Sequence, residues 1–202
     1  MGSYAWRFAY VKSDTGWPRY FALIGSIDPV GLYLNKADKL SYESEKWHRS
    51  GTVLSEDADK FIVRFTAQEF PTLGSNGFFA RRKYLLKGKS AIREFFHIDT
   101  PYDLLQFHLD TYAVIKDTVI HDTIISLPSF LRKRINYMRL HYQDRKTERR
   151  YKVYDPDRSD DVIHLLLFVL YSFTFIQPLF VAIRGYIKVR DVAWFNISGA
   201  VS

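Results

Sequence analysis

An uncharged run of 22 residues, 162–183, constrains the fold of this 202-residue chain more than any other part of the sequence. As one helix, the run would be about 33 Å long, close to the hydrocarbon thickness of a bilayer. Gln177 and Pro178 lie inside it, and the proline should kink or break the helix because it lacks a backbone N–H and clashes with the preceding turn. The run therefore predicts either membrane-associated helices or a buried helical hairpin.

A basic segment leads into this run. Residues 132–158 contain ten Lys or Arg and four Asp or Glu, so they account for an excess of six positive charges in a chain of net charge +7. From Ser129 onward, apolar residues recur at helical spacing, which predicts a basic amphipathic helix. Its apolar stripe is formed by Leu131, Ile135, Met138 and Tyr142.

Basic residues also follow the run, at Arg184, Lys188 and Arg190. Because the basic excess of membrane proteins lies on the cytoplasmic side, two basic flanks favour a bent, re-entrant or in-plane pair of helices with both ends facing the cytoplasm. A nucleic-acid interface would explain the charge but not the apolar run, so nucleic acid is not an expected partner.

The N-terminal part shows strand and helix patterns that predict an α/β domain. Strands are expected at 6–10, 61–66, 112–115 and 119–120, where aromatic and β-branched residues alternate or cluster. Asp28 and Pro29 predict a helix start, with the aspartate as its cap. A short helix is expected at 79–87 and a loop at 47–59. We therefore expect two parts, an α/β part over residues 1–128 and a helical part over residues 129–202.

Three short features carry the candidate chemistry. Residues 74–77, Gly-Ser-Asn-Gly, are types that adopt left-handed backbone at low cost, so this loop is either a pocket wall or a simple turn. Asp99 precedes an expected helix start, where a carboxylate is either a general base or a capping acid. His121 follows an expected strand, and it is either a ligand or an ordinary hydrogen-bonded side chain.

In this order, the features resemble the second half of family-2 inverting glycosyltransferases of the GT-A fold, above all the bacterial and archaeal enzymes that work at the membrane. The resemblance covers about residues 4 to 195. It rests on residues 71–77 followed by arginines at 81–82, on His97-Ile98-Asp99, and on Val119-Ile120-His121.

The resemblance implies a role for each matching residue. Asp99 would match the last acid of the family's x-Glu-Asp motif, the catalytic base, with Ile98 in place of the glutamate. His121 would match the C-terminal histidine that helps to hold the divalent metal and the diphosphate. The implied donor- and phosphate-binding residues are Thr72, Gly74, Ser75, Asn76, Gly77, Arg132 and Arg134.

The resemblance further implies that residues 1–128 form the acceptor-side half of a Rossmann-like GT-A domain. The family's nucleotide-binding strands and Asp-x-Asp metal ligands have no counterpart in this sequence, so Mg²⁺ or Mn²⁺ is expected only together with a donor-binding chain that supplies them. The chain alone should therefore turn over little or nothing.

The implied reaction transfers a sugar from a nucleotide-sugar donor to a glycan or lipid-linked acceptor. It would take place at the cytoplasmic face of the cell membrane, in the synthesis of cell-envelope polysaccharide. The alternative is a non-catalytic module, derived from such a transferase, that binds the membrane surface or a partner enzyme.

Overall fold

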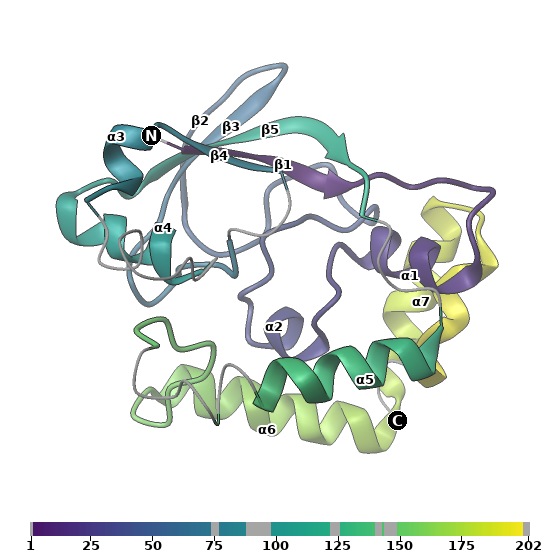
Figure 1. The fold of residues 1–202 in the computed structure, drawn as a ribbon. Coiled ribbons are helices and arrows are strands. Elements are labelled where there is room, and N and C mark those ends of the chain that lie inside the picture. The colour runs from purple at the N-terminus through teal and green to yellow at the C-terminus, as the bar shows by residue number, and fades with distance from the viewer. Residues whose placement is uncertain are drawn as a thin grey trace.

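The fold is a mixed β-sheet with most of its helices on one side (Figure 1). The computed structural model describes residues 2–73, 77–87, 98–121, 126–139, 143 and 149–199. Within these ranges the sheet order is β2-β3-β5-β1-β4. The strands are β1 (Gly2–Phe8), β2 (Thr52–Glu56), β3 (Lys60–Arg64), β4 (Phe78–Ala80) and β5 (Thr111–Val119). β1 runs parallel to β5 and antiparallel to β4, whereas β3 is antiparallel to both β2 and β5. The expected α/β class is confirmed at this level.

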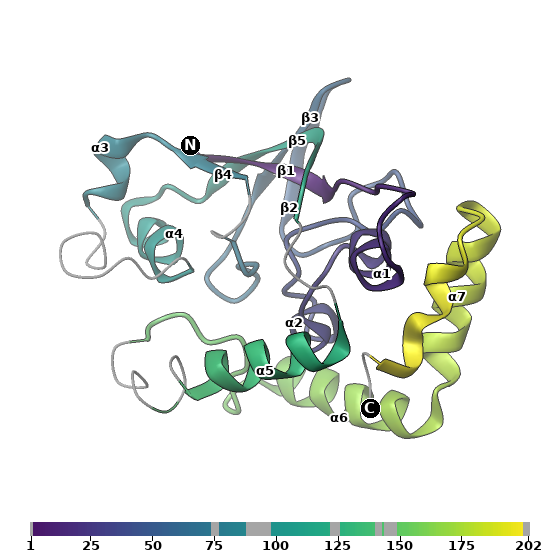
Figure 2. The ribbon, with the colours of Figure 1, turned by 45° about the vertical axis from the view of Figure 1, so that its right-hand side comes forward.

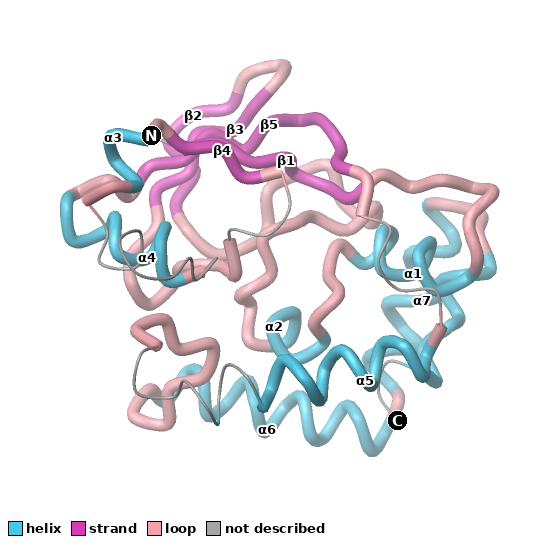
Figure 3. The backbone as a smooth tube through the Cα atoms, in the orientation of Figure 1, coloured by secondary structure: helices cyan, strands magenta, loops and turns pink. Residues whose placement is uncertain are grey.

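The helices lie mostly below the sheet in Figures 1 and 2, and Figure 3 shows the strands as one layer above them. The α-helices are α1 (Gly16–Ile24), α2 (Pro29–Tyr33), α3 (Arg82–Leu85), α4 (Asp99–Leu104), α5 (Leu127–Met138), α6 (Ser159–Thr174) and α7 (Ile176–Lys188). Two 3₁₀ segments are η2 (Leu105–Phe107) and η4 (Val192–Gly199).

The first hydrophobic core lies against one face of the sheet. Successive strand residues point to opposite faces, so alternate residues of the three central strands enter this core. Five of them are at most 1% exposed: Tyr4, Phe61, Val63, Tyr112 and Val114.

A second core joins the two ends of the chain. Phe21 of α1 packs against Phe130 of α5, with 5.4 Å between the ring centroids. Ala182 of α7 and Trp194 of η4 are buried in the same cluster. This core takes residues from both sides of position 128. The division into an α/β part and a helical part stays a prediction, and the structure shows that the two parts share a core.

Polar contacts hold the C-terminal segment against α1. Asp191, which is buried, accepts hydrogen bonds from Tyr10 and from Arg19 at 3.1 Å, and from the backbone N–H of Ala193 at 2.7 Å. Burial acts to raise the pKa of Asp191, but the hydrogen bonds from Tyr10 and Ala193 and the charge of Arg19 outweigh it, so the pKa lies below its ordinary value. The aspartate therefore remains ionised and keeps this anchor at neutral pH.

Several local expectations are confirmed and others are wrong. Asp28 caps α2 by accepting the N–H of Val30 at 3.1 Å, with Pro29 in the first turn. The loop expected at 47–59 contains strand β2, which pairs with β3. The helix expected at 79–87 is instead β4 followed by α3, because 78–80 pair with β1 before the chain turns. Tertiary pairing overrides weak local preference in both cases.

The long apolar run forms two helices, α6 and α7, bent by 81°. The break lies at Phe175, whose φ is +55°, and not at Pro178 as expected. Pro178 lies in the first turn of α7, where a missing N–H costs no helical hydrogen bond. Among the described residues, no single helix is long and apolar enough to cross a bilayer, although the bent pair together would be.

We predict that Gly185→Ala destabilises the protein, because the added Cβ would lie 2.4 Å from the buried ring of Trp194. Overpacking of this kind costs about 1–3 kcal/mol. Gly31→Ala is the matched control, since its Cβ would meet Asp28 at an ordinary 3.5 Å within helix α2. Urea unfolding should show a loss of stability for the first variant and none for the second. Equal stability of the two variants would contradict a tight Gly185–Trp194 contact.

Candidate functional site

The glycine loop is described only at its edges, because the expected site residues Gly74, Ser75 and Asn76 lie outside the described residues. Thr72 donates both its backbone N–H, at 2.7 Å, and its hydroxyl, at 3.0 Å, to the carbonyl of Lys36. Gly77 has φ +65°, the left-handed conformation that glycine adopts without strain. The hydroxyl of Thr72 thus ties the loop to the segment that follows α2.

Gly77 and His121 lie near the same end of the parallel β1–β5 pair. A Cβ on Gly77 would meet the Val119 side chain at 3.4 Å, and His121 follows two residues after Val119. The His121 ring stacks on Phe8 at 5.1 Å between centroids, and Phe8 ends β1. Ligands of open α/β sheets bind outside the carboxyl ends of parallel strands, which is where these residues lie.

Asp99 begins α4, so its expected place at a helix entry is confirmed. Its side chain is fully buried. One carboxylate oxygen accepts the backbone N–H groups of Arg150 at 2.8 Å and Tyr151 at 2.7 Å, and the other lies 2.6 Å from Nε of Arg149. One turn later, Asp103 binds the Arg150 guanidinium through both oxygens, at 2.5 and 2.9 Å. Together, the two aspartates hold residues 149–151 against α4.

Asp99 and His121 belong to opposite ends of β5. Two residues after Asp99, the carbonyl of Pro101 accepts a hydrogen bond from Tyr112, near the start of β5, whereas His121 follows its end. A strand rises about 3.3 Å per residue, so the seven steps from Tyr112 to Val119 span roughly 20 Å. Figures 1 and 2 likewise place α4 far from the end of β5. The described residues therefore bring Gly77 and His121 together but leave Asp99 apart from them.

The two arginines expected at a phosphate lie on α5. Arg134 forms an ion pair with Asp28, the cap of α2, and so joins α5 to α2. Arg132 is exposed. Arg134 therefore carries a contact within the fold, and Arg132 is open to solvent.

His121 also borders a pocket of about 20 Å³, together with Phe8, Ala9 and Ile120, which has room for about one water. In the part of the chain that the structure describes, no three His, Cys, Asp or Glu side chains are grouped so that they could hold a metal ion.

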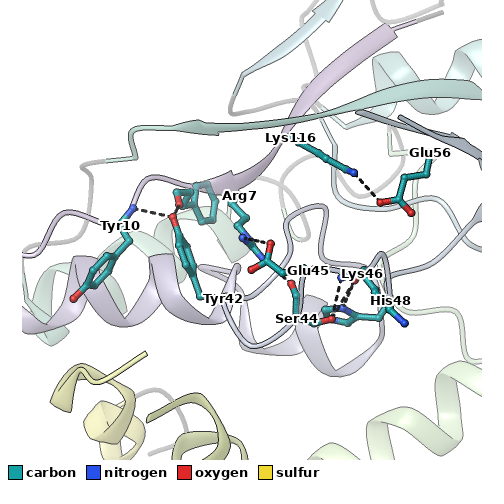
Figure 4. A network of polar contacts seen from close by, with 10 residues as sticks. Arg7, Tyr10, Tyr42, Ser44, Glu45, Lys46, His48, Glu56 and Lys116 are labelled. Carbon is teal, nitrogen blue, oxygen red and sulfur yellow. Dashed lines mark hydrogen bonds and ion pairs between the residues drawn. The ribbon is translucent and has the colours of Figure 1, made fainter. Parts of the chain in front are cut away.

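A larger cavity, of about 440 Å³, lies between residues 41–49, helices α1 and α2, and α7. Residues 41–49 are held by a polar network (Figure 4). The Tyr42 hydroxyl accepts the N–H of Tyr10 at 3.2 Å and donates to the carbonyl of Phe8 at 2.9 Å. The Arg7 guanidinium lies over the Tyr42 ring at 4.8 Å and pairs with Glu45 at 3.2 Å.

Sequence reasoning missed this cavity. Its lining includes Arg49 and Trp194, which are 145 residues apart in the chain and come together only in the fold. Local pattern gives no signal for such a contact. The only sequence hint was the abundance of aromatic residues near the N-terminus, which line part of the wall at Tyr20.

The outer sides of α6 and α7 form an exposed apolar surface, which we call the docking face. Its residues are between 45% and 82% exposed: Ile163, Leu166, Leu170, Phe173, Ile176, Leu179, Phe180, Ile183 and Ile187. The expected apolar stripe of α5 is also turned outward, since Leu131, Ile135 and Met138 are 43–53% exposed. Soluble monomers rarely expose contiguous apolar patches beyond a few hundred Å² unless they bind something there.

No model of a known protein family, no curated protein and no solved structure matches this chain.

We predict that Asp99→Asn destabilises the protein by about 3 kcal/mol, the cost of leaving one partner of a buried ion pair uncompensated. The Arg149 side chain would keep its charge while only 10% exposed. Asp110→Asn is the control, because Asp110 meets Arg64 at 3.8 Å in a pair that is 36–57% exposed and should contribute less than about 1 kcal/mol. Urea unfolding at neutral pH measures both. If Asp99→Asn left the free energy of unfolding unchanged, the anchoring role of Asp99 would be contradicted.

Proposed function

We propose that this chain works at a membrane surface as the acceptor-side and membrane-docking part of a family-2 inverting glycosyltransferase. The main observation behind this proposal is the exposed apolar docking face on α6 and α7. Sugar transfer rests on the ordered motifs of the sequence and on the position of Gly77 and His121 at the carboxyl ends of β1 and β5.

Membrane docking is supported by the side on which the apolar residues lie. Helices α6 and α7 pack inward through few residues, such as Phe168 against Tyr33 at 5.1 Å, and through the buried Ala182 and Gly185. Many of their large apolar side chains point outward instead, with Phe173 82% and Ile176 70% exposed. A soluble helical hairpin would bury these residues, whereas an in-plane amphipathic pair would place them in the acyl boundary of a bilayer.

Charge supports an anionic membrane. Helices α5 and α7 carry no acidic residue. Arg132 and Lys133 are exposed on α5, and Lys188 and Arg190 are exposed at the end of α7. Basic side chains beside an apolar face contribute about 1 kcal/mol each near an anionic lipid surface. The pattern is that of a protein lying on the cytoplasmic leaflet of the cell membrane.

The proposed chemistry is a single displacement. The acceptor hydroxyl attacks the sugar carbon, its proton passes to a base, and the bond to the nucleotide diphosphate breaks. Asp99 is the proposed base, and His121 and the loop at 74–77 are proposed to border the donor. Because Asp99 lies near the start of β5 and His121 follows its end, this reaction requires α4 and the donor to come together by a rearrangement of the chain. Mg²⁺ or Mn²⁺ would be held mainly by the donor-binding chain, since these ions prefer oxygen ligands.

The alternative, a non-catalytic membrane-binding or enzyme-partner module, is favoured by one observation. Both oxygens of Asp99 are already engaged by Arg149 and by the N–H groups of Arg150 and Tyr151. A carboxylate that accepts two N–H groups and is also paired with an arginine is a poor base until these contacts are released. Catalysis would thus require residues 149–151 to move away from α4.

We predict that the protein binds vesicles of phosphatidylcholine and phosphatidylglycerol (1:1) more tightly than vesicles of phosphatidylcholine alone. The double variant Leu166→Gln/Phe173→Gln should bind at least about tenfold more weakly, since each lost apolar side chain costs 1.5 kcal/mol or more. Raised salt and the variant Arg132→Gln/Lys133→Gln should weaken binding to the vesicles that contain phosphatidylglycerol and leave binding to phosphatidylcholine vesicles unchanged. Vesicle co-sedimentation measures all of these.

The control for this experiment is Phe79→Gln. Phe79 is 71% exposed on β4, in the sheet layer above the helices, and should not touch the membrane. Vesicle binding that is absent, or that falls equally in the control and the double variant, would contradict the docking face.

We predict that sugar transfer from a nucleotide-sugar to membrane lipid extracts requires both this chain and a donor-binding chain with the Asp-x-Asp ligands. Asp99→Asn should lower the rate by about 100-fold or more, the usual contribution of a general base. Asp103→Asn is the matched control, because it also loosens residues 149–151 but removes no base. A radiolabelled sugar transfer assay follows the product.

Two results would change the proposal. Transfer that survives Asp99→Asn unchanged would remove Asp99 as the base. Transfer that never depends on this chain would favour the non-catalytic module.

A further inference from the structure

Strand β4, helix α3 and segment η2 form a basic surface to which the proposed function assigns no role. Its cations are all exposed: Arg81, Arg82, Lys83 and Lys87. Its large apolar side chains are between 45% and 71% exposed: Phe79, Leu86 and Phe107. We propose that this surface, which we call the basic face, binds an acidic, extended segment of a partner protein.

The positive charge of the basic face is not neutralised within the described part of the chain. None of its cations forms an ion pair with a described carboxylate. The acids of neighbouring segments are bound elsewhere, Asp103 to Arg150 and Asp110 to Arg64. Like charges that lie close together repel one another, so a ligand with several negative charges relieves this repulsion.

Lys87 joins the end of α3 to η2. Its Nζ lies 5.7 Å from the ring centroid of Tyr84 and 5.9 Å from that of Phe107. Tyr84 in turn borders a small cavity together with Gly2 of β1 and Ala80 of β4. These contacts place the lysine, the two rings and the edge of the sheet on one surface of the molecule.

The sheet edge at β4 suits an extended segment. β4 pairs with β1 through residues 78–80, and no described strand pairs with its other side. An edge strand presents backbone N–H and C=O groups that an added strand can bind. Because side chains alternate along a strand, the added segment can place apolar side chains at Phe79 and carboxylates at the cations that follow β4.

Other occupants agree less well with the geometry. Figures 1 and 2 place α3 on the side of the molecule away from α6 and α7, so a protein that rests on a bilayer through the docking face holds the basic face away from it. Nucleic-acid bases stack on open ring faces, whereas Lys83 and Lys87 already lie near the ring of Tyr84. A second copy of this chain carries the same net charge of +7 and would be repelled.

The inference rests on the basic face and not on sugar transfer, and fluorescence anisotropy of a labelled peptide tests it. The probe is a peptide of alternating Glu and Val residues, mixed with the full chain at low ionic strength. The same peptide with Gln in place of Glu should bind at least about tenfold more weakly, since each exposed ion pair contributes roughly 1.5- to 5-fold. Raised salt should weaken binding of the Glu peptide.

Arg81→Gln/Arg82→Gln should weaken binding of the Glu peptide about fivefold or more. Arg132→Gln/Lys133→Gln is the matched control, because it removes the same charge from exposed positions of α5 and should leave peptide binding unchanged. Phe79→Gln should also weaken binding, since it removes the exposed ring of β4. Urea unfolding should be the same for all three variants, because these side chains are exposed.

Three results would overturn the basic face as a surface for acidic segments. They are no binding of the Glu peptide, equal binding of the Glu and Gln peptides, and an equal loss of binding in the two double variants. Because this assay contains neither vesicles nor a nucleotide-sugar, its failure is distinguishable from failure of the proposed function.

Three further measurements would replace the partner. A dT oligonucleotide that binds more tightly than the Glu peptide, and more weakly to Arg81→Gln/Arg82→Gln, would make the basic face a nucleic-acid interface. Self-association in analytical ultracentrifugation that the same variant abolishes would make the partner a second copy. Binding to phosphatidylglycerol vesicles that falls as much in this variant as in Arg132→Gln/Lys133→Gln would place the basic face on the membrane.

Discussion

The contact between Trp194 and Gly185 sets the arrangement of the helical layer. The indole lies where a Cβ of residue 185 would be, so η4 and α7 approach more closely than two helices with larger side chains could. This contact fixes the inner side of α7, and the remaining side must then face outward. The same ring borders the cavity. One close approach therefore decides both the exposure of the docking face and one wall of the cavity.

Ion pairs fix the packing of other segments of the chain. Asp99 and Asp103 hold residues 149–151 against α4, and Asp28 joins α5 to α2 through Arg134. These pairs bring together segments that lie about 50 to 100 residues apart. Residues with candidate chemical roles are thus also structural ties. If Asp99 acts as a base, its release from Arg149 would couple catalysis to movement of the basic segment.

The docking face and the cavity give the proposed function a common geometry. A bent apolar helix pair would rest in the membrane interface, with basic residues on α5 and after α7 near the headgroups. The cavity opens beside Phe180 on the same helix.

The sequence by itself determined the elements whose signals are local. The Asp28 cap, the strands around Phe61 and Val114, and the division of the apolar run into bent helices followed from capping, alternation and uncharged length. Tertiary structure alone decided the rest. It paired β2 and β4 into the sheet, moved the helix break from Pro178 to Phe175, and turned the stripe of α5 outward. It also buried the carboxylate of Asp99. The reason is that pairing, burial and ion pairs depend on partners far away in the chain, which periodicity and spacing do not encode.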